Sequence, residues 1–87
     1  MAAAEILSTA STAASSSDIV VAAGTPLAVG LKGCSVGATV RIYLKDDAGA
    51  YNFANEINSQ NPNTMITGPG LYRFTRVAGA TCGVYSG

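Results

Sequence analysis

Apolar and polar side chains alternate over short stretches from Asp18 to the end of the chain, which is the pattern of β-strands. The clearest case is the run ATVRIYLKDD at 38–47, in which every second residue from position 40 to position 44 is apolar. A period of two places the apolar side chains on one face. The polar set then occupies the other face, and it consists of Arg41, Tyr43 and Lys45.

The other strands are predicted from similar short runs separated by turn residues. The turn signals are Gly49 in DDAGAY, Pro69 with Gly70 in ITGPG, and Gly79 in VAGA. In the first, Gly49 is free to take the left-handed conformation, and in the second Gly70 suits the third position of a type II turn. No amphipathic helix is indicated. About seven short strands at this spacing predict an all-β fold, a small antiparallel β-sandwich or barrel. The further strand regions are 18–24, 25–33, 50–57, 65–67, 71–77 and 81–86.

Residues 1–18 differ from the rest, because every position from Ser8 to Ser17 is Ser, Thr or Ala. Such a segment buries too little apolar surface to offset its ordering entropy, so alone it is expected to be mobile. We therefore divide the chain into an extended N-terminal arm, 1–18, and a β domain, 19–87. We expect a neighbouring chain to hold the arm, which would lie along that chain and could add a strand to an exposed sheet edge. The alternative is that the arm folds on its own domain. Glu5 and the lack of a positive start argue against a signal peptide.

The chain has 87 residues, and few of them are charged. Five basic and five acidic residues give a formal net charge of zero, and charged residues make up 11% of the sequence. No field therefore steers the chain to nucleic acid or an anionic membrane, and no apolar run is long enough to span a bilayer. Low charge is typical of obligate interfaces, and small sheets with open edges tend to be completed by partners. We expect a homo-oligomer.

Candidate catalytic chemistry is sparse, because the sequence contains no histidine. This removes the commonest general base and the commonest metal ligand. Asp46 and Asp47 fit a hairpin turn better than a calcium site, which needs six to eight oxygen ligands. A glycosidase-like pair of Asp47 with Glu56 is conceivable but secondary to the turn interpretation. We expect no enzyme activity, no cofactor and no metal.

The two cysteines, Cys34 and Cys82, do not form the disulfide framework of a small secreted domain, and a reducing, intracellular site of synthesis is the simpler interpretation. Each stands beside small residues, so we expect thiols that pack as small apolar groups. A disulfide within or between chains is the alternative.

Arginines and tyrosines are the remaining candidates for a site. Arg73 and Arg76 could meet phosphate or carboxylate, but the local basic density is too low for a nucleic-acid footprint. The tyrosines could line a sugar or base platform, although a share in the core and an interface fits them better. We therefore expect a protein interface, to which we assign Ile6, Leu7, Arg41, Tyr43, Arg73 and Arg76.

The segments LKDDAGAY and ITGPGLYRFTRVAGATCGVYSG resemble small β-rich virion proteins of tailed bacteriophages. The resemblance lies in Gly-Pro-Gly, then Tyr-Arg, then Arg-Val-Ala-Gly-Ala, and it covers 66–87 best and 19–87 loosely. This group includes capsid decoration (cement) proteins and short head or tail components.

The resemblance implies a non-enzymatic oligomer, with a trimer favoured, clamped on the outer capsid surface after synthesis in the bacterial cytoplasm. Its partners would be the major capsid protein or other virion proteins, with neither nucleic acid nor a membrane. The alternative is a tail or fibre component, or an adhesion module that binds glycans. No binding residue is carried over from the resemblance.

Overall fold

The structure, a computed structural model, describes residues 4–87, so Met1 to Ala3 of the predicted arm lie outside the described residues. The described part is all-β, as predicted, and contains strands but no helix. The count is nine strands where about seven were expected. They are β1 (Ala4–Ala10), β2 (Ala14–Ser15), β3 (Ile19–Val21), β4 (Leu27–Lys32), β5 (Thr39–Lys45), β6 (Tyr51–Asn58), β7 (Asn63–Ile66), β8 (Gly70–Arg76) and β9 (Cys82–Ser86).

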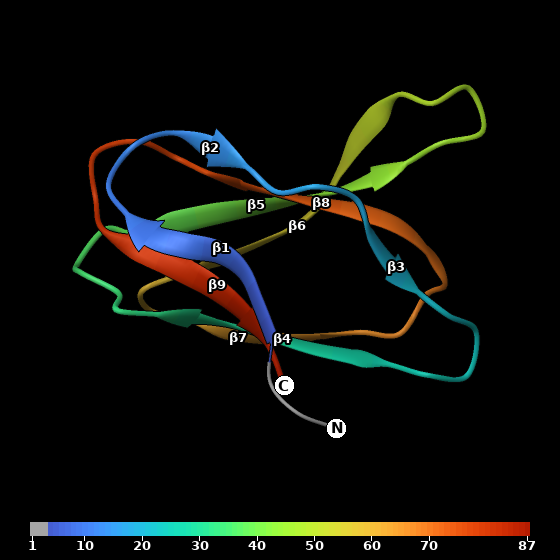
Figure 1. Ribbon diagram of the computed structural model, residues 1–87, viewed down its shortest axis with the longest axis horizontal. Coiled ribbons are helices and arrows are strands. Elements are labelled where there is room, and N and C mark those ends of the chain that lie inside the picture. The colour runs from blue at the N-terminus through green and yellow to red at the C-terminus, as the bar shows by residue number, and fades with distance from the viewer. Residues whose placement is uncertain (1–3) are drawn as a thin grey trace.

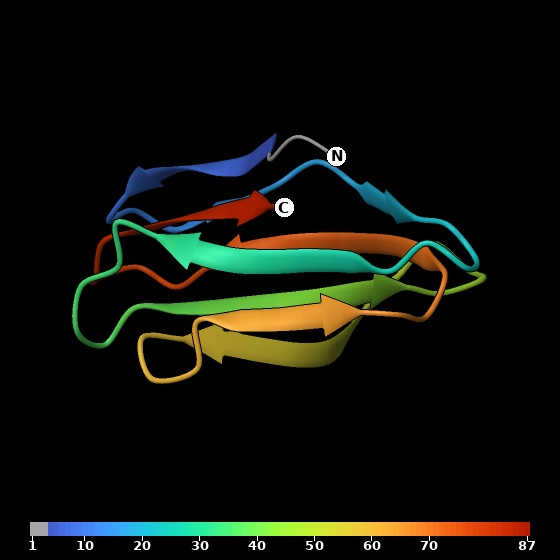
Figure 2. The same cartoon turned by 90° about the horizontal axis from the view of Figure 1, so that it is seen from below.

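The strands form two antiparallel sheets that stack as a sandwich (Figures 1 and 2). Sheet A has the order β1-β9-β4-β7. Sheet B has the order β2-β8-β5-β6. The short strand β3 also pairs with β8, at the other end of β8 from the residues that pair with β2. The centre of sheet B is the β5–β8 pair, in which Ile42 lies opposite Phe74.

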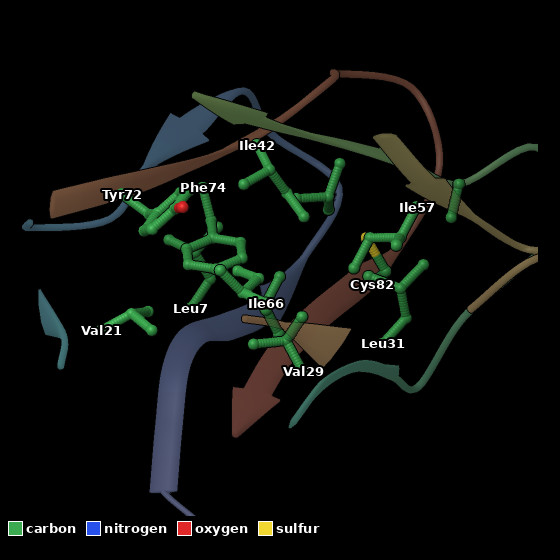
Figure 3. Close-up of a cluster of buried hydrophobic side chains, with 13 residues drawn as sticks. Leu7, Val21, Val29, Leu31, Ile42, Ile57, Ile66, Tyr72, Phe74 and Cys82 are labelled. Atoms are coloured by element: carbon green, nitrogen blue, oxygen red, sulfur yellow. The ribbon is translucent and has the colours of Figure 1, made fainter. Parts of the chain in front are cut away.

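The core lies between the sheets and is made by the buried apolar side chains of both (Figure 3). On β5, Val40 and Ile42 are 0% and 1% exposed, and on β8 Phe74 is 0% exposed. Cys82 and Val84 both reach the core from β9, as expected for two residues on one face of a strand. The β5 alternation therefore fixes an outward face as well, which carries Arg41, Tyr43 and Lys45.

The described part of the predicted arm, residues 4–18, is an integral part of the sandwich, which is the alternative rather than the expected contact with a neighbouring chain. β1 pairs with β9 at one edge of sheet A, and β2 pairs with β8 in sheet B. Leu7 packs into the core with 8% exposure, and Ile6 packs partly against it. No structural boundary therefore falls at residue 18, because main-chain pairing and a single leucine anchor a segment otherwise rich in Ser, Thr and Ala.

Two turns show why glycine stands where it does. Gly49 in the β5–β6 hairpin has φ of +84°, as predicted, and the Asp46 carboxylate accepts hydrogen bonds from the amides of Ala48 and Ala50 at 2.9 Å. Gly70 has φ of +153° and begins β8; a Cβ there would lie 2.9 Å from Leu44 Cδ1. Both positions disfavour any larger residue.

The two cysteines are free thiols in different environments, so only one of them packs as an apolar group. Cys82 is fully buried, and burial raises the pKa of its thiol, whereas Cys34 is exposed in the β4–β5 loop. A buried thiol with a raised pKa holds little of the reactive thiolate.

A thiol reagent such as Ellman's reagent is therefore expected to modify one cysteine of the folded protein rapidly and the second only on unfolding. Cys34→Ser should remove the rapid phase and leave the slow one. Rapid modification of two thiols under native conditions would contradict the burial of Cys82.

Candidate binding surface

The outward face of sheet B gathers aromatic and basic side chains from three adjacent strands, and we call it the sheet B face. The face consists of one row of side chains that runs across β6, β5 and β8, together with the residues on either side of that row. In that row Tyr43 lies opposite Phe53 on one side and Arg73 on the other. The flanking residues are Arg41 and Glu56 towards one end, and Lys45, Tyr51 and Asp18 towards the other.

The aromatic rings of this face are only partly covered. Phe53 is 60% exposed although it is among the largest apolar side chains in the protein. Its ring meets that of Tyr43 edge to face, with centroids 6.2 Å apart, which is a favourable aromatic geometry. Exposed aromatic residues beside arginine are typical of the energetically dominant part of protein interfaces.

Arg73 is held over the ring of Tyr51. The guanidinium carbon lies 3.8 Å from the ring centroid, and Nη2 donates a hydrogen bond to the Tyr51 hydroxyl at 2.9 Å. Arg73 Nε is buried and has no hydrogen-bond partner within residues 4–87. The guanidinium is thus positioned by stacking and by one hydroxyl, and its side chain remains partly open to a partner.

Asp18 joins this group from the segment between β2 and β3. Its carboxylate accepts a hydrogen bond from the Tyr51 hydroxyl at 2.6 Å and one from Lys45 Nζ at 3.2 Å, and Arg73 Nη2 lies 3.9 Å away. The Tyr51 hydrogen bond, followed by the bond and charge of Lys45 and the charge of Arg73, outweighs desolvation and lowers the pKa of Asp18. The hydrogen bond to Asp18 in turn raises the pKa of Lys45.

Acid titration should expose the contribution of Asp18. Because its pKa in the folded protein is below the usual value of about 3.9, the stabilisation is complete above that value and is lost as the pH falls through the folded-state pKa. Asp18→Asn is therefore expected to lower stability at pH 7 and to flatten its fall below about pH 4, as measured by urea unfolding over a pH series. The control is Asp47→Asn at the exposed hairpin, and equal acid limbs for wild type and Asp18→Asn would contradict this role.

Of the six residues predicted at an interface, three come together on this face: Arg41, Tyr43 and Arg73. Arg41 forms an exposed, loose ion pair with Glu56 at 3.8 Å, worth little by itself. Leu7 and Arg76 are instead buried, and Ile6 is half-buried at the opposite sheet. Leu7 and Arg76 therefore lie in the interior of this domain rather than on a surface open to a partner.

Arg76 has a structural task inside the sandwich. It is 3% exposed, and its guanidinium donates to three main-chain carbonyl oxygens: Thr12 at 2.6 Å, Ser8 at 2.7 Å and Cys82 at 3.0 Å. Two of these acceptors lie in the N-terminal segment. Arg76 therefore ties that segment to β9, while Arg73, an odd number of residues earlier on the same strand, faces outward.

Five members of the sheet B face were not predicted at an interface: Asp18, Lys45, Tyr51, Phe53 and Glu56. For four of them the signal was present, since Lys45 belongs to the outward set of β5, and Tyr51, Phe53 and Glu56 lie opposite that set on β6. No pattern in the sequence indicated that Asp18 would lie on this face. It lies 27 residues from Lys45 and 33 from Tyr51, and only the pairing of β3 with β8 brings it to this face.

The carboxylates weighed as catalytic or metal-binding groups are separated or already engaged. Asp46 accepts from the amide of Asn52 as well as from the turn, and this hydrogen bond, ahead of those from the backbone, lowers its pKa. Glu56 lies opposite Arg41, well along β6 from the hairpin of Asp47. Residues 4–87 hold no group of three or more Cys, Asp and Glu side chains placed to share a metal ion.

Comparisons with known protein families, with curated proteins and with solved structures give no match to this chain. Within the described residues there is no helix of the length and apolarity needed to cross a membrane.

Proposed function

We propose that this protein is a structural subunit that binds another protein through the sheet B face, and that it decorates or cements a bacteriophage capsid. The observation that carries the binding surface is the convergence of Tyr43, Phe53 and Arg73 in one row, with Phe53 largely exposed. The assignment to a capsid draws on the resemblance of residues 66–87 to small virion proteins.

The geometry of the face suits a flat protein partner. Neighbouring side chains on a sheet lie in fixed rows, so a partner meets a surface that needs little ordering on binding. The face carries three cations, Arg41, Lys45 and Arg73, against two carboxylates, Asp18 and Glu56. A partner with a modest excess of acidic groups would complement it. Many copies on one shell would then give a high total holding strength.

A tail or fibre component, or a glycan-binding adhesion module, remains the second candidate. The exposed ring of Phe53 beside Tyr43 favours it, because sugars stack on open aromatic faces. Against it, one side of the Tyr51 ring is already covered by the Arg73 guanidinium. The proposal assigns the protein no reaction, cofactor or metal.

Fractionation of phage particles from the genome that encodes this chain separates these functions. Mass spectrometry is expected to find the protein on purified heads in many copies. Its presence on tails instead, or binding of the isolated protein in a glycan screen, would move the assignment to the second candidate. Its absence from purified particles would overturn a virion role altogether.

A further inference from the structure

The antiparallel topology brings four loops to one end of the sandwich, the left end in Figures 1 and 2, and we call it the loop end. The loops are residues 11–13, 33–38, 59–62 and 77–81. They contain no Asp, Glu, Lys or Arg. The other end, by contrast, carries Asp46 and Asp47 in its hairpin. Charge depletion marks the cores of protein interfaces rather than ordinary solvent-facing loops.

Hydrogen bonds join these loops into one platform. Three main-chain bonds, one for each neighbouring pair of loops, hold them together: Gly79 N to Ser11 O at 3.0 Å, Ser35 N to Thr81 O at 2.9 Å, and Ser59 N to Ala38 O at 3.0 Å. The Ser35 and Ser59 hydroxyls add further bonds between the same loops. A platform tied in this way loses little conformational freedom on binding.

The loop end has both a projection and a hollow. Val36 stands at the tip of the 33–38 loop with 96% of its side chain exposed, the largest exposure of any large apolar residue in the described chain. Val36 lines one side of an open hollow of about 280 Å³, and Ser59 and Gln60 are in another part of its wall. An apolar knob next to a recess is the arrangement that a symmetric contact uses, since each copy offers what the other receives.

We infer that the loop end is a contact surface between two copies of this chain, with Val36 of each copy seated at the hollow of the other. A partner with charged groups would bury them there without a counterion, at a high cost in desolvation. A second copy brings an equally uncharged surface, and a chain of zero net charge does not repel itself. The knob and the hollow lie on the same end, as a two-fold contact requires.

The area of the loop end limits the expected strength of association between two copies. The molecule measures 33 × 29 × 19 Å, and its longest axis is horizontal in Figure 1, with the four loops at one end of it. A cross-section of 29 × 19 Å limits the area buried between two copies to at most about 1,100 Å² in total, near the lower limit for specific interfaces. Association should therefore be weak and dependent on concentration in free solution, and favoured where a larger assembly holds copies close together.

Sedimentation velocity over a concentration series tests this inference on the full chain. The wild-type protein is expected to shift from monomer towards dimer as its concentration rises. Val36→Asp and Gln60→Glu, which place a charge on the knob and at the hollow, should each weaken association at least about tenfold. The matched control is Val20→Asp, a 69% exposed valine on β3 in sheet B, which should associate as wild type does.

The contact between copies is independent of the partner proposed for the sheet B face, so either can fail alone. Wild type that stays monomeric at the highest concentration would overturn the inference. So would Val36→Asp that associates like wild type, or Val20→Asp that abolishes association equally. Circular dichroism of each variant establishes that it is folded, which is expected because all three side chains are exposed.

Discussion

Replacing Arg76 by alanine is expected to lower the free energy of unfolding by about 3 kcal/mol, since three main-chain carbonyls lose a charged donor inside the sandwich. The loss corresponds to a fall of about 15 °C in the midpoint of thermal unfolding for a domain of this size. Because Ser8 and Thr12 supply two of the acceptors, hydrogen exchange should show β1 losing protection more than β5 does.

Two further variants complete the test: one separates the geometry of Arg76 from its charge, and the other is a control at an exposed arginine. Arg76→Lys keeps the charge but not the planar fork, so its effect should be intermediate. Arg41→Ala removes an exposed arginine from sheet B and is expected to change stability by less than about 0.5 kcal/mol. An Arg76→Ala variant that unfolds at the wild-type denaturant concentration would contradict the structural role given to this side chain.

Phe74→Ala is expected to cost about 4 kcal/mol, because it removes a fully buried ring from the middle of the core. The core is small, so neighbouring side chains can close only part of the resulting cavity. Chemical denaturation of the two proteins measures the difference directly.

The chain supplies its own control, because its only other phenylalanine is Phe53 on the sheet B face. Phe53→Ala removes the same side chain from a largely exposed site and should cost less than about 1 kcal/mol, mainly the edge contact with Tyr43. Equal losses for the two variants would mean that the burial described for Phe74 is wrong.

The alternation of apolar and polar residues in β5 allowed its buried and outward-facing positions to be predicted from the sequence. Because side chains on a strand alternate, the run at 38–47 predicted the core positions Val40 and Ile42 and the outward set that includes Arg41 and Tyr43, although Leu44 near the end of the strand is 37% exposed. The same rule, applied to β8, places Arg73 and Arg76 on opposite faces, since they are three residues apart. Treating them as one pair overlooked the parity of the strand, and this alone would have put Arg76 beside Phe74 in the interior.

The N-terminal segment was harder to predict for a physical reason. Ser, Thr and Ala give it little apolar surface, so its order depends on groups far away in the chain: pairing with β9, and hydrogen bonds from Arg76, which lies 68 residues from Ser8. Gly83 also allows this close approach, since a Cβ there would meet Leu7 O at 2.9 Å. Local composition cannot report contacts of this range.

The loop end and the sheet B face give the molecule two separate surfaces with different chemistry. One is uncharged and has its loops joined by hydrogen bonds, and it suits a second copy of the chain. The other combines arginine with exposed aromatic rings, which suits a different protein. If the two surfaces bind as proposed, one to a second copy and the other to a capsid shell, many small contacts would add up to a stable layer.

The proposed function depends most on binding of the partner through the sheet B face. The most direct test titrates capsid shells, assembled without this protein from the genome that encodes it, with wild type, Phe53→Ala, Arg73→Ala and Met65→Ala. Met65 is the matched control, a 58% exposed apolar side chain on sheet A. Phe53→Ala and Arg73→Ala are each expected to weaken binding about tenfold or more, while Met65→Ala should bind as wild type does. Wild-type affinity for both sheet B variants, with lost binding for Met65→Ala, would contradict it.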